Sequence, residues 1–234
     1  MQDEEIQRLT ASEPLTLAQE YSMQATWRND GDKLTFIICL APSLPSSPTS
    51  SNKITAGVQD APDRMVGDVN LFLYAHSPEN EDENEDDDTD AETGVVGELE
   101  IMIASKPARG RGLAYSTLTT FLTYITHNLD AILSPSSFTS PHNHTNDHSH
   151  TQQLHLRYLR VKIAQSNTPS LNLFHKLGFT RTSETANYFG EIEMRLSSPG
   201  IEELVKSVNM DGEGEVRELE YGARGDEKEN GAKE

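Results

Sequence analysis

The sequence predicts an α/β fold in which helices cover both faces of a mixed β-sheet. Some runs alternate between apolar and polar residues, as half-buried strands do, and others repeat their apolar residues at helical spacing. These runs follow one another in the order helix, strand, strand, strand, helix, strand, helix, strand, strand, which favours a layered α/β architecture. The 234 residues are enough for one such domain with appendages.

The first half of the chain is predicted to supply one main helix and two strands. Residues 16–27 are expected to be helical, because Thr16 and Gln19 match a capping box at the start of an apolar-periodic run. The other elements predicted here are a short turn at 6–9 and strands at 33–40 and 65–74, which pair antiparallel.

A strand, a turn and a helix follow at the centre of the chain. Residues 98–103 alternate between polar and apolar side chains, and Pro107 ends this strand. A helix is then predicted over residues 114–132, after Gly110 and Gly112. Glycines at a helix start allow a tight turn and the close approach of a ligand. The N–H groups of the first helical turn then suit an anion such as a phosphate.

The last predicted elements surround one more helix. A strand is expected at 154–165, and Thr168 is expected to be the N-cap of a helix with Pro169 in its first position. Gly178 ends this helix. The two strands that complete the sheet are predicted at 179–182 and 188–196.

Acidic residues gather in two segments of the chain. The net charge is −19; residues 79–92 hold 10 acids and no base, and residues 197–234 hold 11 acids and 5 bases. The rest is nearly neutral, with 17 acids and 14 bases. Polar segments of this kind bury too little apolar surface to fold. We therefore expect one folded domain at residues 1–196, with disordered insertions at 41–64, 75–93 and 134–153. A disordered acidic tail is expected at residues 197–234.

The composition excludes several classes of protein. The acidic balance argues against nucleic-acid binding, which needs a basic surface, and no apolar run is long enough to predict a membrane span. The single Cys39 excludes an intrachain disulfide and suits a reducing compartment, so we expect a cytoplasmic protein, with the nucleus also open. Histidines at 142–150 have the spacing of zinc ligands, but the segment is low in complexity and no metal is expected.

Two sequence motifs, in order and each on the expected element, resemble the GCN5-related N-acetyltransferases (GNAT). Arg109, Gly112 and Ala114 match the family pattern Gln/Arg-x-x-Gly-x-Gly/Ala. Residues 167–179 resemble its Asn-x-x-Ser/Ala segment followed by (Tyr/Phe)-x-Lys-x-Gly-Phe. The phrases RLTASEPLTLAQEY and GELEIMIA are similar to the N-acetyltransferase 9-like subfamily, whose first strand and helix have no counterpart in residues 1–9.

The resemblance implies the mostly antiparallel GNAT sheet, acetyl-CoA as co-substrate, no metal, and an acceptor amine, either an α-amine or a lysine, on a protein or peptide. Backbone amides of the loop would hold the CoA pyrophosphate, and the preceding strand would pair with the pantetheine arm. Asn167 would contact the pantetheine or order the site; alternatively, it is only a turn residue before the N-cap. The other cofactor-binding residues implied are Ile101, Met102, Ile103, Arg109, Gly110, Arg111, Gly112, Leu113 and Ala114.

Acetyl transfer to an amine benefits from a base, because lysine amines with a pKa of about 10 and α-amines with a pKa of about 8 are mostly protonated at neutral pH. Glu98 and Glu100 share one face of the central strand and are the candidates, acting directly or through a water. Glu100 ranks first because it is nearer the phosphate loop. Alternatively, both face solvent or pair with Arg160 or Lys162 on a neighbouring strand.

The group that protonates the leaving thiolate is open. Phe174 stands where many GNAT enzymes carry a tyrosine, and phenylalanine has no proton to donate. Ser170 could hold a water or hydrogen-bond the sulfur, although a simple place in the first helical turn is the alternative, and Tyr188 is a further candidate donor. A second function class therefore stays open, namely a catalytically weak or inactive relative that binds acetyl-CoA or a protein partner.

Overall fold

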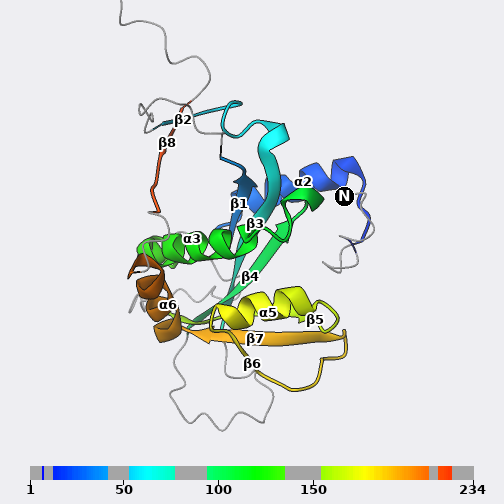
Figure 1. The fold of residues 1–234 in the computed structure, drawn as a ribbon, viewed down its shortest axis with the longest axis vertical. Coiled ribbons are helices and arrows are strands. Elements are labelled where there is room, and N and C mark those ends of the chain that lie inside the picture. Colours follow the sequence, from blue (N-terminus) through cyan, green and yellow to red (C-terminus); the bar gives the residue numbers. More distant parts are fainter. Residues whose placement is uncertain are drawn as a thin grey trace, which may run out of the picture.

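The computed structural model describes residues 7, 13–41, 53–76, 94–134, 154–210 and 216–222. They form a six-stranded sheet in the order β1-β3-β4-β5-β7-β6 and a separate two-stranded pair, β2-β8 (Figure 1). The strands are β1 (Lys33–Cys39), β2 (Lys53–Thr55), β3 (Met65–Ala75), β4 (Val95–Ile103), β5 (Leu156–Ala164), β6 (Thr180–Arg181), β7 (Glu191–Ser197) and β8 (Glu220–Gly222). The helices are α2 (Leu17–Asn29), α3 (Leu113–His127), α4 (Leu129–Ile132), α5 (Thr168–Lys176) and α6 (Ser198–Met210), with 3₁₀ turns η1 (Pro62–Arg64) and η3 (Lys106–Ala108).

The main sheet is mixed and mostly antiparallel, as predicted. Strand β3 pairs antiparallel with both β1 and β4, and β7 pairs antiparallel with β5 and β6. Strands β4 and β5 are the parallel pair at the centre. The expected antiparallel pairing of residues 33–40 with 65–74 is confirmed, with Lys33 opposite Phe72 at one end of the register.

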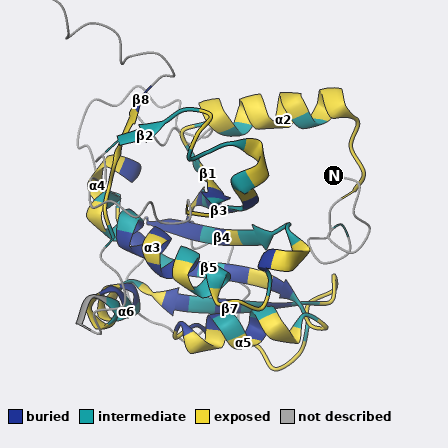
Figure 2. Ribbon diagram, turned by 45° about the horizontal axis from the view of Figure 1, so that its top comes forward, coloured by how far each residue is buried: buried dark blue, intermediate teal, exposed yellow. Residues whose placement is uncertain are grey.

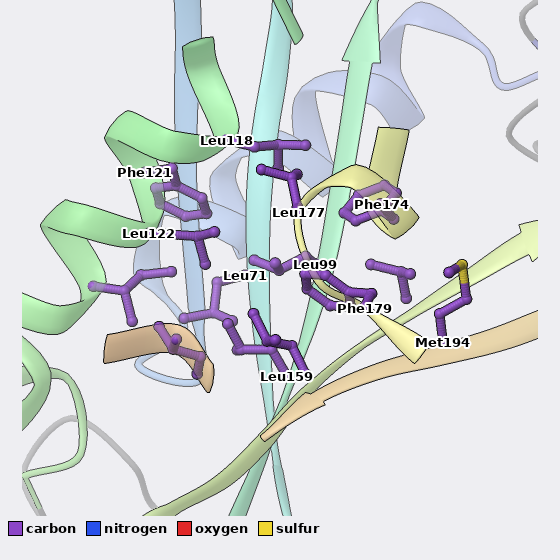
Figure 3. Packing of buried hydrophobic residues seen from close by; sticks show 14 of the residues in the cluster. Leu71, Leu99, Leu118, Phe121, Leu122, Leu159, Phe174, Leu177, Phe179 and Met194 are labelled. Atoms are coloured by element: carbon purple, nitrogen blue, oxygen red, sulfur yellow. The ribbon is translucent and has the colours of Figure 1, made fainter. Parts of the chain in front are cut away.

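Helices α3, α5 and α6 cover one face of the sheet and bury the main core (Figures 2 and 3). Alternate residues of each strand point to this face because the side-chain period of a strand is two. Leu71, Leu99 and Leu159 come from three neighbouring strands and are each at most 2% exposed. Helix α2 lies against the opposite face, where Trp27 meets Phe72 edge to face with 5.6 Å between ring centroids. The prediction that helices cover both faces is therefore confirmed.

The structure confirms one predicted helix start and corrects two details of the other helices. The capping box of Thr16 and Gln19 begins α2, with side-chain and backbone bonds in both directions. The single helix predicted at 114–132 is wrong, because the chain leaves helical geometry at Asn128 and α4 continues separately. The N-cap of α5 is Asn167 and not Thr168: the Asn167 side chain accepts from the N–H of Ser170 at 3.3 Å.

The chain beyond residue 197 corrects a larger expectation. A disordered tail was expected from residue 197, but α6 follows β7 directly and packs against α3, β5 and β7. Ile201 and Val205 are one turn apart and are 4% and 6% exposed, so this helix completes the core. The expected boundary at residue 196 therefore cuts through the folded unit.

Short ordered pieces also lie within one predicted insertion. Strand β2 and turn η1 fall inside residues 41–64, where disorder was expected, and β2 pairs parallel with β8. The Tyr221 hydroxyl of β8 donates to Asp60 at 2.7 Å. The strand predicted at 188–196 begins only at Glu191, because residues before it form a turn in which Gly190 has a φ of 78°. The acidic segment 79–92, the histidines at 142–150 and the turn predicted at 6–9, apart from Gln7, lie outside the described residues.

Candidate active site

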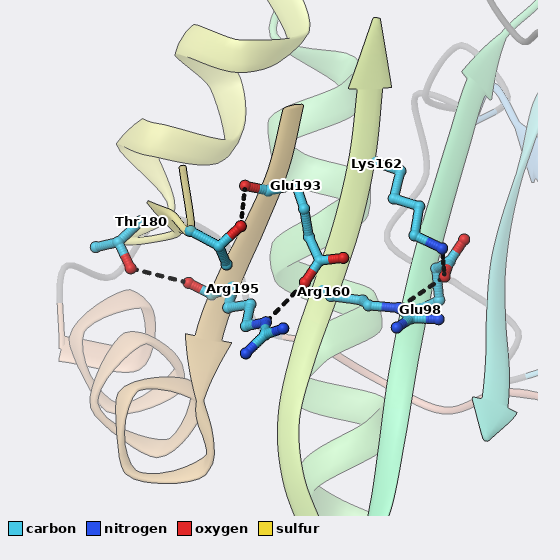
Figure 4. Close-up of polar contacts among 7 residues, drawn as sticks. Glu98, Arg160, Lys162, Thr180, Glu193 and Arg195 are labelled. Carbon is cyan, nitrogen blue, oxygen red and sulfur yellow. Dashed lines mark hydrogen bonds and ion pairs between the residues drawn. The ribbon is translucent and has the colours of Figure 1, made fainter. Parts of the chain in front are cut away.

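The two central strands separate halfway along their length. The parallel ladder joins residues 95–98 of β4 to residues 156–160 of β5, and no further pair is formed although β4 runs on to Ile103 and β5 to Ala164. Their outer edges remain paired with β3 and β7 over these stretches. Beyond Glu98, the edges that face each other therefore carry backbone groups outside the sheet ladder, and Figure 4 shows the two strands diverging there. Such a gap can receive an extended chain that pairs with strand edges.

The loop that follows β4 is shaped by two glycines and braced by one arginine. Gly110 and Gly112 have φ angles of 70° and 80°, a region that side chains other than glycine rarely adopt. A Cβ atom added at either position would meet no atom within 4 Å, so the loop faces open space. Nε of Arg109 donates to the carbonyl of Ile103 at 2.8 Å and its Nη2 reaches the carbonyl of Ala104 at 3.5 Å. Arg109 thus ties the loop to the end of β4.

Helix α3 begins on this loop and directs its N-terminus at the open space. Gly112 is the N-cap and makes no side-chain cap bond. Within the described part of the chain, the N–H groups of residues 110–115 donate to no acceptor. Six neighbouring N–H groups and the positive end of the helix dipole form a site for an anion such as a pyrophosphate. The predicted residues Gly110, Arg111, Gly112, Leu113 and Ala114 are thus brought together at one helix start, and Arg111 is exposed there.

The second motif stands at the end of β5, on the other side of the gap. The backbone N–H of Asn167 donates to the Ala164 carbonyl at 2.8 Å, and its side chain caps α5. Asn167 is therefore the cap itself and not a turn residue before it. Ser170 is half-buried in the first turn of α5. Phe174 is 3% exposed and packs edge to face on Phe179, so this position belongs to the core.

Glu98 is held by two cations. Its carboxylate accepts from Nε of Arg160 at 2.8 Å and lies 3.3 Å from Nζ of Lys162, and its side chain is 12% exposed (Figure 4). Arg160 is also stacked over the ring of Tyr74, at 5.1 Å from its centroid. Of the two arrangements considered for Glu98, the structure shows the ion pair with both basic residues of β5. The Glu98 carboxylate is therefore already engaged by both of these side chains.

Glu100 has different surroundings on the same strand face. It makes no ion pair or hydrogen bond with the described residues. Loss of hydration raises the pKa of its carboxyl above 4.5, and the charges of Glu98, Asp68 and Glu191 raise it further, while Lys162 opposes them. A raised pKa makes the carboxylate a stronger base near neutral pH, so Glu100 fits the role of base better than Glu98 does.

Two polar residues of β3, which the sequence reasoning did not select, stand beside Glu100. Asn70 lies directly opposite Glu100 in the β3–β4 register, and Asp68 is two residues along β3 on the same face. Burial also raises the pKa of Asp68, although the hydrogen bond from Asn70 opposes this. The alternation Asp68-Val69-Asn70-Leu71 was the sequence signal that could have identified them.

The remaining predictions concern Tyr188 as a proton donor, bound metal and membrane spans. Tyr188 is 97% exposed at a turn after β6. Among the described residues, no group of three potential metal ligands lies together, and no helix there is long and apolar enough to cross a membrane.

Comparison with known proteins adds family relationships to this geometry. Residues 1–180 match the family described as an acetyltransferase (GNAT) domain. The N-acetyltransferase 9-like protein of Schizosaccharomyces pombe is 35% identical over 206 residues, which cover 84% of this chain and 84% of that protein. Human alpha/beta-tubulin-N-acetyltransferase 9 is 35% identical over 197 residues, covering 84% and 71%. The crystal structure of Arabidopsis thaliana NAA60 in complex with acetyl-CoA is 13% identical, with coverage of 84% and 91% and a TM-score of 0.46.

The family match covers more than half of the chain, and the two relatives exceed 30% identity over most of their own length. The motifs at Arg109 and Asn167 occupy the elements on which the family resemblance placed them. This chain therefore belongs to the GNAT family of acetyltransferases, within its N-acetyltransferase 9-like group.

Proposed function

We propose that this acetyl-CoA-dependent N-acetyltransferase binds acetyl-CoA between β4 and β5 and uses Glu100 as the base that deprotonates the acceptor amine. The observation that carries the proposal is the divergence of the two central strands beside the glycine loop. The unpaired N–H groups of residues 110–115 would hold the pyrophosphate, and the free edge of β4 near Ile101, Met102 and Ile103 would pair with the pantetheine.

Each chemical requirement of acetyl transfer has a candidate group in this chain. Glu100 would take the amine proton, directly or through one water, and leave the electron pair on nitrogen for attack on the thioester carbon. An N–H on the β4 edge that faces β5 would stabilise the tetrahedral oxyanion. The leaving thiolate has a pKa of about 8.5, so water can protonate it without a dedicated acid. This agrees with a phenylalanine at position 174, buried in the core.

The acceptor that we propose is a protein amine, and tubulin is the first candidate to test. Three relatives, from Homo sapiens, Mus musculus and Drosophila melanogaster, are named alpha/beta-tubulin-N-acetyltransferase 9, with 32–35% identity to this chain. We also propose a reducing compartment, the cytoplasm or the nucleus, as its location, since the single Cys39 cannot form an intrachain disulfide.

Incubation of the purified protein with acetyl-CoA and tubulin-derived peptides tests this function. We expect mass spectrometry to find one added acetyl group, and a second peptide with a blocked α-amine identifies whether the N-terminus or a lysine accepts it. Transfer to neither peptide nor to intact tubulin would refute tubulin as the acceptor, and a general peptide library then tests the reaction itself.

The second candidate function is an acetyl-CoA-binding protein with weak or no catalysis. The observation in its favour is Phe174, which puts no hydroxyl where many family members have one. A thermal-shift titration separates the two functions together with the acetylation assay, because a ligand of the folded state raises the melting temperature whether or not it reacts. Stabilisation by acetyl-CoA without acetyl transfer to any peptide would favour this second function.

A further inference from the structure

Asn70 carries a buried hydrogen-bond acceptor for which the described residues provide no donor. The residue lies in the middle of β3 and is 2% exposed. Its Oδ1 atom has no hydrogen-bond partner in the described part of the chain. Leaving a buried polar atom without a partner is destabilising, so such an atom calls for an explanation.

The orientation of the Asn70 amide is set by its neighbour. Nδ2 of Asn70 donates to Oδ2 of Asp68 at 2.8 Å. Reversing the amide would place its oxygen against the Asp68 carboxylate, where two acceptors would repel each other. While Asp68 is ionised, Oδ1 of Asn70 is therefore turned away from Asp68 and must find its donor elsewhere.

Glu100 is the residue directly opposite Asn70 across the β3–β4 ladder. Side chains of such a pair project from the same face, with Cβ atoms about 4.5–5.5 Å apart, which is within the reach of a glutamate carboxyl group. As a carboxylate, Glu100 has only acceptor atoms and cannot satisfy Oδ1 of Asn70. As a carboxylic acid it has one O–H, which is the donor that Oδ1 lacks.

We propose that Asn70 is a positioning residue for Glu100, and that its Oδ1 accepts a hydrogen bond from the O–H that Glu100 gains when it takes a proton. This inference rests on the proposed role of Glu100 as the base. In that step an N–H bond of the acceptor amine breaks, its electron pair stays on nitrogen, and an O–H bond forms on Glu100. The buried acceptor is thus satisfied in the protonated state that the reaction produces, and the amine loses its proton more readily.

The charges around Glu100 act in the same direction. A hydrogen bond donated by the neutral acid favours that acid, as do partial loss of hydration at the exposed Glu100 side chain and nearby negative charge. Titratable and charged groups from five strands face this side of the sheet. They are Lys33 of β1 with its partners Asp30 and Asp32, Asp68 and Tyr74 of β3, Glu98 of β4, Tyr158, Arg160 and Lys162 of β5, and Glu191, Glu193 and Arg195 of β7. Because Arg160 and Lys162 are engaged by Glu98, they oppose the protonation of Glu100 only weakly.

Two variants shift the pKa of Glu100 in opposite directions if the inference is correct. Asn70→Leu keeps the number of side-chain heavy atoms and removes the acceptor, together with the donor to Asp68, so the pKa of Glu100 falls by about half to one unit. The double variant Asp68→Asn with Asn70→Asp keeps both the total charge and the bond between these positions. It places an ionised acceptor opposite Glu100, so the pKa of Glu100 rises.

Carboxyl ¹³C NMR titration of the unliganded protein measures this pKa directly, and the acid limb of the kcat profile should move with it while the KM for acetyl-CoA stays unchanged. Equal pKa values of Glu100 in the wild type and both variants would overturn the inference, as would a fall in kcat without movement of the acid limb. If Asn70→Leu does not fold, Asn70→Ala, which also removes the acceptor, replaces it and should likewise lower the pKa of Glu100. The expected changes in the pKa of Glu100 could also occur in a protein whose wild type transfers no acetyl group. That result would support the Asn70–Glu100 hydrogen bond and overturn the proposed function instead.

Discussion

Glu98 and Glu100 lie two residues apart on one strand face, and we predict opposite effects when each is replaced by glutamine. Glu98→Gln removes the charge that holds Arg160 at 2.8 Å and Lys162 at 3.3 Å. At these distances and an effective dielectric constant of 20, one such pair is worth about 5–6 kcal/mol before desolvation and screening. The side chains are 12%, 21% and 35% exposed, and the glutamine amide retains one bond, so a net loss of about 1–3 kcal/mol in the free energy of unfolding is expected.

Glu100→Gln should instead leave the protein equally stable or slightly more stable at pH 7. The pKa of Glu100 is raised in the folded state, mainly by desolvation and then by Glu98. A raised carboxyl pKa means that stability is fully present below the unfolded value, near 4.5, and is lost as the pH rises through the folded value. Glutamine carries no charge to desolvate. The variant should therefore gain free energy of unfolding at pH values above the folded pKa of Glu100, and this gain should vanish below pH 4.5. Solvent screening of this exposed residue keeps it under about 1 kcal/mol.

The rate of acetyl transfer should be affected in the reverse order, with Glu100→Gln more damaging than Glu98→Gln. If Glu100 accepts the amine proton, its amide should slow acetyl transfer by about a hundredfold to ten-thousandfold, with unchanged affinity for acetyl-CoA. The loss should shrink at high pH, and sooner for an α-amine than for a lysine, because the free amine then becomes abundant. Chemical denaturation at pH 4.5 and pH 7, with acetylation rates from pH 6 to pH 10, measures both effects. If Glu98→Gln slows transfer more than Glu100→Gln does, the assignment of the base is wrong.

Three further predictions concern the loop and the core. Gly112→Glu should abolish acetyl-CoA binding in calorimetry, because its charge opposes a phosphate. The positive φ strains the new side chain, but its Cβ meets open space, so the protein should stay folded. Unchanged affinity would refute the phosphate loop. Arg109→Ala should lower both stability, by about 1–2 kcal/mol, and acetyl-CoA affinity, since the brace to β4 is lost, whereas Arg111→Ala should change affinity alone. Ile201→Ala should cost about 2–5 kcal/mol in urea unfolding and the exposed control Glu202→Ala under about 0.5 kcal/mol; equal losses would show that α6 does not complete the core.

Local sequence patterns determined most of the secondary structure. Three features depend only on residues that are neighbours in the chain, so their structures follow from local geometry. They are the capping box of Thr16 and Gln19, the alternation in residues 98–103 and the glycines at 110 and 112. Glycine appears where φ is positive because other side chains are strained there. The same motifs identified the family and predicted the cofactor loop, since a helix start with free N–H groups is itself a local structure.

Helix α6 was missed because composition averages over a segment. The acidic residues of 197–234 gave that segment a disordered composition, but Ile201, Leu204 and Val205 form an apolar face that gains stability only against a core. Likewise, residue identity alone cannot show that Asn128 interrupts the long helix or that Asn167, and not Thr168, caps α5. Competing caps of similar preference are decided by the path of the chain that enters the helix.

The different surroundings of Glu98 and Glu100 were decided by tertiary structure alone. In the sequence they are two carboxylates on one strand face that differ only in their distance from the glycine loop. Strand register places Glu98 opposite Arg160, whereas Glu100 lies opposite the buried Asn70 and beyond the point where β4 and β5 separate. Burial and charge act through space over a few ångströms, and Asp68, Glu98 and Arg160 come from three strands that only the fold brings together.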